Sequence, residues 1–340
     1  MDMREILHKL SEREDLTSEE VYSALVEIVE GGATDAQVGA FIMGTKMKGE
    51  TVEEIGGAGR FFRERATKVK VSNPEELVDT CGTGGDRSGT FNVSTVTAFV
   101  LAGAGVRVAK HGNRSVSSRS GSADFLEHAG ARIDLTPDEV ATMIEEIGIG
   151  FMFAPLFHPA MKRVIGPRKE VGVRSLFNLV GPLSNPAGAG RQLLGVFSKA
   201  LVDKLAHVLR KLGVKKAFVV HGKDGIDEVS VSDATLIGEV DEQGVRLYEF
   251  VPEELGIPRR KLGDVCISSP EESIRLGFSV LEGEEGPHRD IVLLNATFGL
   301  LASGKTADRK DALEMAKESI DSGRAKRKLE EFVELSNKLR

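Results

Sequence analysis

From residue 77 onward, short runs of apolar and often β-branched residues alternate with segments that suit helices. The runs lie at 77–80, 106–109, 151–154, 193–197 and 217–220. The helix-compatible segments between them include 93–102, 138–147 and 200–212. This alternation favours parallel strands, because each helix carries the chain back to the edge from which the next strand starts. The sequence therefore predicts an α/β fold with a mostly parallel central sheet.

The later part of the chain departs from this alternation. Residues 236–240 and 245–251 flank an Asp-Glu-Gln-Gly turn and predict an antiparallel hairpin. Segment 162–180 is predicted to be helical, and so is the tail from residue 307.

The first 66 residues predict a separate group of helices. A threonine is followed at the third position by Glu or Gln three times, and each pair can close the first turn of a helix. The pairs are Thr17 with Glu20, Thr34 with Gln37, and Thr51 with Glu54. We therefore expect a small helical domain at 1–70, joined by segment 162–190, and a larger α/β domain at 71–161 and 191–340.

A glycine-rich stretch, CGTGGD at 81–86, directly follows the first predicted strand. Glycines let the backbone turn several N–H groups toward one anion, and the helix predicted to begin near Asn92 adds further free N–H groups. Asn92, Ser94 and Thr95 supply side-chain donors nearby. This combination predicts a phosphate site, although the G-x-G-x-x-G dinucleotide pattern is absent from the chain.

A second candidate, the serine-rich loop at 110–122, follows the next strand and reads KHGNRSVSSRSGS. Its serines, bases and histidine suit an oxyanion better than a protein core. Because parallel strands end at one edge of a sheet, both loops are expected to converge where α/β proteins bind ligands. A solvated surface loop is the alternative.

Two neighbouring carboxylates, Asp227 and Glu228, follow the strand predicted at 217–220. Acidic pairs are common in loops, so the pair alone indicates little. Beside two anion-binding loops it becomes a candidate Mg²⁺ site, because this cation prefers oxygen ligands and bridges to phosphates. Four bases at Arg163, Arg168, Lys169 and Arg174 form a solvated face unless one points into the cleft toward a carboxylate ligand.

A further motif, GLLASGKT at 299–306, matches the expression for a nucleotide-binding P-loop. Its apolar Leu-Leu-Ala filling suits a buried helix that ends at a Gly304 cap instead. We therefore expect a helix here, with a P-loop NTPase as a distant alternative.

Charge and composition restrict the partners. The formal net charge is −7, which argues against nucleic acid as a partner. The stretch from Arg87 to Ala123 nevertheless holds five basic residues and no acidic one. No apolar run approaches the ~18 residues of a membrane span, and the charged N-terminus does not resemble a signal peptide. Two cysteines are too few for a disulfide framework, so we expect free thiols, a cytoplasmic location and no membrane contact.

Taken in order, the motifs closely resemble the anthranilate phosphoribosyltransferase family, which belongs to the nucleoside phosphorylase-like phosphoribosyltransferases. The resemblance spans essentially the full length. It is carried by GTGGD (82–86), TFNVST (90–95), KHGNRSVSS (110–118), SGSAD (120–124), FAPLFHPAMK (153–162), FNLVGPLSNP (177–186) and the pair Asp227-Glu228.

The resemblance implies a fold, a reaction and residue roles. The fold is a small helical domain joined to a larger α/β domain, dimeric through the helical part. The reaction transfers the 5-phosphoribosyl group from phosphoribosyl pyrophosphate to the amino group of anthranilate in tryptophan biosynthesis and releases pyrophosphate. Lys110, Asp227 and Glu228 are implied as catalytic, Ser94, Asp227 and Glu228 as ligands of Mg²⁺, and Gly82, Asn113, Arg168, His111 and Pro182 as anthranilate contacts. The implied donor contacts are Gly82, Gly85, Asp86, Thr90, Asn92, Val93, Ser94, Thr95, Lys110, His111, Gly112, Asn113, Arg114, Ser115, Val116, Ser117, Ser118 and Ser122.

Besides Arg119, which conservatively replaces a common lysine, three positions depart from the family pattern. Arg87 and Ser88 stand where small residues are common, and Asp233 stands where glycine is common. Two alternatives remain open from sequence: a pyrimidine-nucleoside phosphorylase, and a non-catalytic paralogue that binds nucleic acid.

Overall fold

A computed structural model describes residues 2–86, 88–114 and 121–339 of the chain. Within these residues, a seven-stranded sheet has the order β3-β2-β1-β4-β5-β6-β7. Neighbours from β3 to β5 pair in parallel, whereas β6 and β7 are antiparallel, so both the parallel sheet and the hairpin are confirmed. The strands are β1 (Val78–Gly82), β2 (Val108–Gly112), β3 (Ile149–Phe153), β4 (Arg191–Gly195), β5 (Lys216–Gly222), β6 (Thr235–Asp241) and β7 (Gly244–Phe250).

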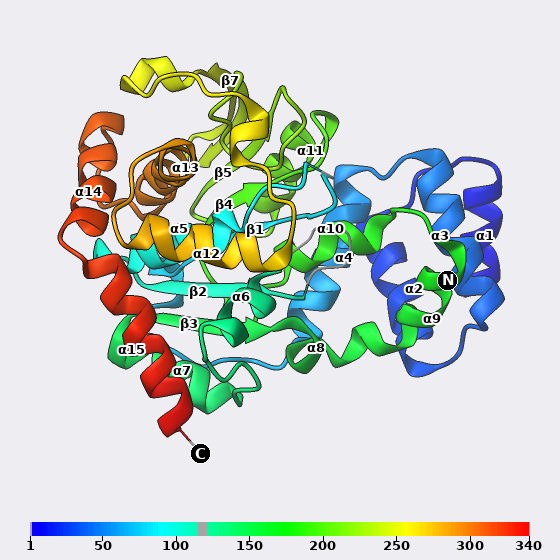
Figure 1. The fold of residues 1–340 in the computed structure, drawn as a ribbon. Helices are drawn as coiled ribbons and strands as arrows, with labels where there is room; N and C mark the ends of the chain where they lie inside the picture. Colours follow the sequence, from blue (N-terminus) through cyan, green and yellow to red (C-terminus); the bar gives the residue numbers. More distant parts are fainter. Residues whose placement is uncertain (1, 87, 115–120, 340) are drawn as a thin grey trace.

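Helices cover both faces of this sheet and form a separate group at one end of the molecule (Figure 1). The α-helices are α1 (Met3–Ser11), α2 (Ser18–Glu30), α3 (Asp35–Lys48), α4 (Val52–Arg65), α5 (Val93–Gly103), α6 (Ser122–His128), α7 (Pro137–Ile147), α8 (Ala154–Phe157), α9 (Lys162–Val171), α10 (Leu176–Leu183), α11 (Ala200–Lys211), α12 (Pro270–Leu281), α13 (Pro287–Ser303), α14 (Arg309–Asp321) and α15 (Arg324–Lys338). The 3₁₀ helices are η1 (Pro74–Glu76), η2 (Pro159–Met161), η3 (Pro252–Leu255) and η4 (Leu262–Val265).

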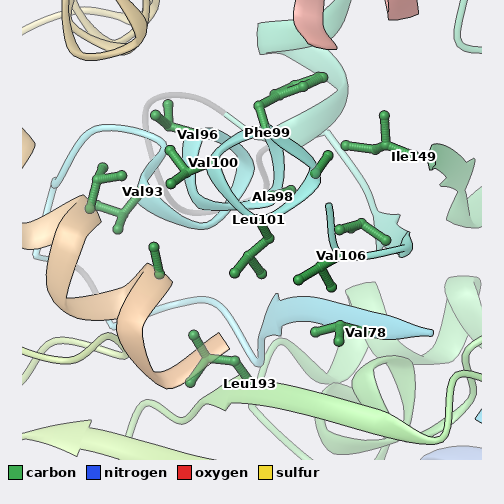
Figure 2. Packing of buried hydrophobic residues seen from close by; sticks show 14 of the residues in the cluster. Val78, Val93, Val96, Ala98, Phe99, Val100, Leu101, Val106, Ile149 and Leu193 are labelled. Atoms are coloured by element: carbon green, nitrogen blue, oxygen red, sulfur yellow. The ribbon is translucent and has the colours of Figure 1, made fainter. Parts of the chain in front are cut away.

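Successive strand residues serve two cores, because side chains alternate between the faces of a sheet. Leu193 of β4 packs in one core with α5 and α13, whereas Leu194 packs in a second core with α11. Figure 2 shows Leu101 of α5 close to Val78 and Leu193, which belong to the neighbouring strands β1 and β4. Both faces are apolar, which explains why the strands appear in the sequence as continuous apolar runs.

The helical unit consists of α1 to α4 together with α9 and α10, which lie beside them (Figure 1). All three threonine capping boxes predicted at the starts of α2, α3 and α4 are present. Segment 162–180 is helical, as predicted, but it is divided into two helices: Gly172 ends α9 with a left-handed φ of 68°, and α10 begins at Leu176. Phe62 of α4 and Leu194 of β4 share one core, so the helical unit packs directly against the sheet domain.

The P-loop-like match is part of a helix. Residues 299–303 lie within α13, Gly304 ends that helix with φ 74°, and Leu300 is fully buried. A loop that cradles phosphate must expose its backbone, so the structure confirms the helix and removes the NTPase alternative. Among the described helices, none combines the length and apolarity that crossing a membrane requires.

Candidate active site

The sheet has a topological switch point between β1 and β4, because the chain reaches β2 and β3 on one side and β4 and β5 on the other. Open α/β sheets bind ligands in the crevice outside such a point. Gly82 and Gly195 are paired at the carboxyl ends of these two strands. The glycine-rich turn (82–89) starts here, and its Gly84 and Gly85 have φ of 63° and 77°, which favour glycine.

The acidic pair meets this turn. The Gly84 N–H donates to Asp227 Oδ2 at 3.1 Å, and the Asp227 N–H donates to Asp86 Oδ2 at 3.4 Å. A Cβ added to Gly82 would lie 2.8 Å from Asp227 Oδ2. Glycine at position 82 therefore leaves room for the acidic pair to approach the turn.

The carboxylates in this crevice carry more negative charge than their surroundings neutralise. Burial, and then the charge of Asp86, raises the pKa of Asp227 to about 7. Burial, and then the charge of Asp227, raises the pKa of Glu228 well above its usual range. Such a cluster of hard oxygen donors suits a divalent cation. Among the described residues, no group of three or more His, Cys, Asp or Glu side chains is placed so that it could hold a metal ion without other ligands.

Lys110, in the middle of β2, is buried, and its side chain reaches the neighbouring strand β1. Its Nζ donates to the Thr80 carbonyl at 2.6 Å and to Ser94 Oγ at 3.3 Å. Burial lowers the pKa of Lys110, while the charges of Asp79 and Glu228 oppose that shift. The predicted catalytic lysine and the predicted metal ligand Ser94 are therefore in contact.

Behind the serine-rich loop lies a polar network that the sequence analysis did not single out. Asp79 Oδ1 accepts the His111 N–H at 3.2 Å, and its Oδ2 accepts Asn185 Nδ2 at 2.8 Å. Asn185 Nδ2 also donates to the Ala109 carbonyl at 2.8 Å. Desolvation of Asp79 raises its pKa to about 6. A buried acid in a predicted strand, as at Asp79, was the signal available in the sequence.

His111 is 6% exposed, and its side chain faces His158 rather than open solvent. The two Nε2 atoms are 3.1 Å apart. Burial, and then the charge of His158, lowers the pKa of His111 to about 3; burial lowers the pKa of His158 to about 4. The two rings are therefore neutral hydrogen-bond partners, and the buried His158 holds the His111 ring in position.

The start of α5 supplies the polar groups expected beside the turn. Asn92 makes no side-chain capping bond, and its Nδ2 has no partner in the described part of the molecule. Thr95 Oγ1 instead donates to Ser122 Oγ at 3.0 Å, and Val93 is buried. Thr90 belongs to an isolated bridge with Cys266. The Asn92 and Val93 N–H groups already donate to Ser273 Oγ and the Phe91 carbonyl, so Asn92 Nδ2 is the side-chain donor left without a partner among the described residues at this helix start.

The serine-rich loop is described only in part. Gly112 packs against Ser122, and Asn113 Oδ1 accepts the Arg114 N–H at 2.7 Å. Arg114 pairs with Glu127, lies over the Phe153 ring and lines a surface hollow of about 390 Å³. The predicted donor contacts Ser115, Val116, Ser117 and Ser118 lie outside the described residues, as do the Arg87 and Arg119 departures.

The predicted anthranilate contacts outside the loops lie on α9 and α10. Arg168 is over the Phe177 ring at 6.0 Å, and burial lowers its pKa. Pro182 is buried in α10, and its carbonyl accepts Gln192 Nε2 at 2.7 Å. Cys81 and Cys266 are reduced cysteines that are not joined by a disulfide, as expected.

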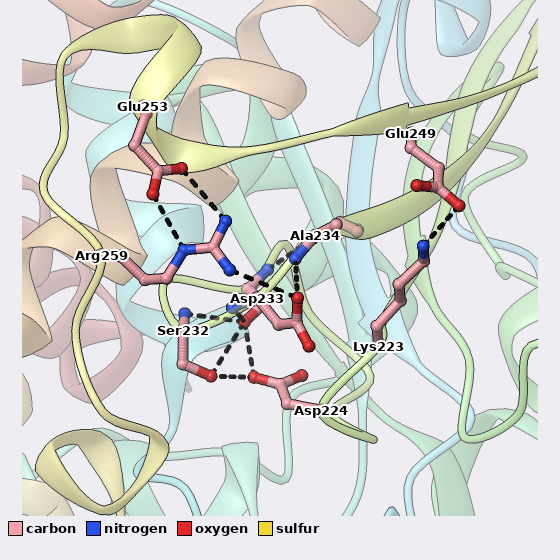
Figure 3. Close-up of polar contacts among 10 residues, drawn as sticks. Lys223, Asp224, Ser232, Asp233, Ala234, Glu249, Glu253 and Arg259 are labelled. Atoms are coloured by element: carbon pink, nitrogen blue, oxygen red, sulfur yellow. Dashed lines mark hydrogen bonds and ion pairs between the residues drawn. The ribbon is translucent and has the colours of Figure 1, made fainter.

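The segment that flanks the acidic pair in the sequence forms a hydrogen-bonded loop, in which Asp224, Ser232 and Asp233 lie together (Figure 3). The carboxylate of Asp224 accepts Ser230 Oγ at 2.6 Å and also accepts Ser232 Oγ. Asp233, a departure from the family pattern, caps the Ala234 N–H at 2.7 Å and pairs with Arg259, which also pairs with Glu253. Asp233 therefore closes the loop with its side chain at a position where glycine is common.

Two family models together cover most of the chain. The glycosyl transferase family helical bundle domain matches residues 4–66, and the glycosyl transferase family a/b domain matches residues 74–326. With the fold and the crevice described above, these matches define the class: this chain is an enzyme of the glycosyl transferase family with a helical bundle and an α/β domain.

Relatives of known name cover the whole chain. The anthranilate phosphoribosyltransferase of Aquifex aeolicus is 66% identical over 99% of both chains, and that of Geotalea uraniireducens is 50% identical over 98% of this chain and 99% of its own. The Thermus thermophilus enzyme structure is 41% identical, with a TM-score of 0.92 over 99% of this chain and 100% of its own. The structure of the Saccharomyces cerevisiae enzyme in complex with PRPP and Mg is 28% identical, with a TM-score of 0.90 over 99% of this chain and 98% of its own. The chain belongs to the anthranilate phosphoribosyltransferase family, as its motifs predicted.

Proposed function

We propose that this chain transfers the 5-phosphoribosyl group from phosphoribosyl pyrophosphate to the amino group of anthranilate, releasing pyrophosphate. The observation that carries the proposal is the contact of the Asp227 carboxylate with the glycine-rich turn, at the sheet's switch point. This contact joins the two features that the donor requires, an anion-binding turn and a group of cation ligands. Full-length similarity to enzymes of this name favours the same activity over the phosphorylase and nucleic-acid alternatives.

The donor is proposed to lie across the glycine-rich turn, the start of α5 and the serine-rich loop. Gly82, Gly85, Asp86 and Thr90 belong to the turn or border it, and Asn92 to Thr95 begin α5. Backbone N–H groups there offer hydrogen bonds to phosphate oxygens. Lys110, which already contacts Ser94, supplies positive charge to the departing pyrophosphate. The whole loop from Lys110 to Ser118, with Ser122, completes the proposed donor site.

The proposed Mg²⁺ ligands are Ser94, Asp227 and Glu228, and their chemistry fits this ion. The raised pKa values of Asp227 and Glu228 reflect excess negative charge that a divalent cation offsets. When bound there, the ion would neutralise pyrophosphate oxygens as the bond to the ribose breaks. The Asp227 carboxylate is held by the backbone N–H of Gly84, and the Asp227 N–H donates to the carboxylate of Asp86.

The acceptor side requires little proton chemistry, because the aromatic amine of anthranilate already carries a lone pair. Catalysis is then mainly positioning and charge stabilisation. Arg168 is proposed to orient the anthranilate carboxylate, with Gly82, Asn113, His111 and Pro182 around the ring. His111 would act as a neutral, fixed hydrogen-bonding wall, because its partner is His158 and its pKa is lowered.

The test follows the loss of anthranilate fluorescence on mixing protein, Mg²⁺, phosphoribosyl pyrophosphate and anthranilate. We expect a loss that depends on all four components and equals the pyrophosphate released. The exposed Arg163→Gln variant serves as the matched positive control. No loss beyond the protein-free control would sink the assignment.

We also propose a cytoplasmic homodimer that associates through the helical unit. Two exposed apolar side chains on this unit support it, Met47 at 65% and Ile165 at 43% exposure. The domain boundaries at 1–70, 162–190, 71–161 and 191–340 remain part of the proposal. Sedimentation equilibrium tests the dimer, and a monomer at micromolar concentration would contradict it.

A further inference from the structure

Arg174 lies in the short connection between α9 and α10, where the chain passes from one helix of the helical unit to the next. Its guanidinium reaches the glycine-rich turn of the α/β domain. A Cβ added to Gly85 would lie 2.7 Å from one terminal nitrogen of Arg174 and 3.1 Å from Cζ. The side chain therefore borders the centre of the proposed donor site, although only its place in a basic helical segment was visible from sequence.

An aromatic ring holds this guanidinium in place. Arg174 Cζ is 4.4 Å from the centroid of the Phe197 ring. Phe197 is itself tied to the turn, because its N–H donates to Thr83 Oγ1 at 3.1 Å and the Thr83 N–H donates to the Gly195 carbonyl at 2.9 Å. Stacking on a ring occupies the face of a guanidinium and leaves its N–H edge available for a planar or tetrahedral anion.

Within the described part of the chain, no carboxylate forms an ion pair with Arg174, whereas many other arginines do form ion pairs. A cation that is seated on a ring, lacks an ion pair and borders an anion-binding turn is matched to an oxyanion from outside the protein. Arg168, by contrast, lies over Phe177, a ring that packs against Phe62 of the helical unit. The two arginines therefore serve different parts of the crevice.

We propose that Arg174 binds a phosphate oxyanion of the donor at the glycine-rich turn, as a donor-binding residue contributed from the α9–α10 connection. This inference rests on the proposed function for the identity of the donor. It assigns recognition of the phosphorylated substrate to Arg174 and leaves the acceptor carboxylate to Arg168.

The experiment titrates inorganic pyrophosphate, with Mg²⁺ present, into the full-length protein and into Arg174→Gln by calorimetry. Losing a charge-assisted bond is expected to weaken pyrophosphate binding roughly 10- to 100-fold. The KM for anthranilate should stay within about twofold, because this interaction is not made with the acceptor. The exposed neighbour Lys169→Gln is the matched control and should bind pyrophosphate like the parent protein.

A second variant keeps the inference testable if Arg174→Gln does not fold. Arg174→Lys retains the charge but loses the planar fork, so its pyrophosphate affinity should fall between those of the parent protein and the Gln variant. Parent-like pyrophosphate affinity in either folded variant overturns the proposal, as does a selective rise in the anthranilate KM. Pyrophosphate binding requires no turnover, so a parent protein that binds pyrophosphate without consuming anthranilate would refute the proposed function alone.

Discussion

The helical unit and the crevice at β1 and β4 differ in whether their polar groups find partners within the protein. In the helical unit, α2, α3 and α4 each start with a complete threonine capping box, and the buried Glu54 binds Lys48 and two backbone N–H groups. In the crevice, α5 starts without a side-chain cap, and Asp227 and Glu228 face one another's charge. Polar groups satisfied by the chain itself stabilise a fold, whereas groups left open are available to a ligand.

The largest expected effect is a loss of turnover on neutralising Asp227, one of the two crevice carboxylates proposed to bind a cation. Asp227→Asn should lower turnover by about 10² to 10³-fold, because it removes a proposed cation ligand from the site of charge stabilisation. The thermal midpoint should stay equal or rise, since the substitution relieves repulsion from Asp86 and Glu228. Fluorescence assays and calorimetric melting give both quantities. A clear drop in melting temperature would show that Asp227 is a structural group like Glu54.

The opposite result is expected for Glu54, a buried carboxylate whose partners all belong to the protein itself. Glu54→Gln should lower the free energy of unfolding by about 3 kcal/mol, because it breaks a buried ion pair and leaves Lys48 with the exposed carboxylate of Asp15 and the Gly49 carbonyl. The turnover number and the KM values of the folded variant should be unchanged. Urea unfolding measures the loss. Its neighbour Glu53, which pairs with Lys211 at the surface, is the matched control, and Glu53→Gln should change stability by no more than about 0.5 kcal/mol.

This contrast also separates what the sequence could predict from what it could not. Capping boxes and strand alternation are local patterns, so the helix starts and the mostly parallel character of the sheet were predictable from neighbouring residues. The break after Gly172 depends on a single left-handed residue, and periodicity does not report it. The bond from Lys110 to the Thr80 carbonyl, the His111–His158 pair and the seat of Arg174 on Phe197 all join distant segments. Only the packed fold specifies these side-chain directions.

An effect of intermediate size is expected for the histidine pair, on how the free energy of unfolding depends on pH. The folded pKa of His158, about 4, is below its usual value of 6.5, so the unfolded chain binds more protons between these values. The free energy of unfolding of the parent protein should therefore fall as pH drops through this window, with His158 contributing about 2 kcal/mol between pH 6.5 and 5. His111 adds a shift in the same direction.

His158→Gln removes the contribution of that residue, so the stability advantage of the parent protein should shrink on acidification. Urea unfolding at pH 7, 6 and 5 tests this, with the exposed His8→Gln as a control whose curve runs parallel to that of the parent protein. Parallel curves for the parent protein and His158→Gln would mean that the His158 ring takes up its proton equally readily in the folded and unfolded states, which contradicts a lowered pKa.

The smallest expected effects come from changing one residue to alanine at the start of α3 and one at the start of α5. Thr34→Ala removes a capping bond from α3 and should cost about 1 kcal/mol of stability with unchanged pyrophosphate affinity. Asn92→Ala should change stability by less than about 0.5 kcal/mol, because Asn92 caps nothing and its buried Nδ2 has no partner in the described part of the chain. It should instead weaken pyrophosphate binding by roughly tenfold, the loss of one hydrogen bond to a charged group. If Asn92→Ala instead lost stability and kept its pyrophosphate affinity, Asn92 would stabilise the start of α5 as Thr34 stabilises the start of α3. The donor would then be bound elsewhere along the crevice.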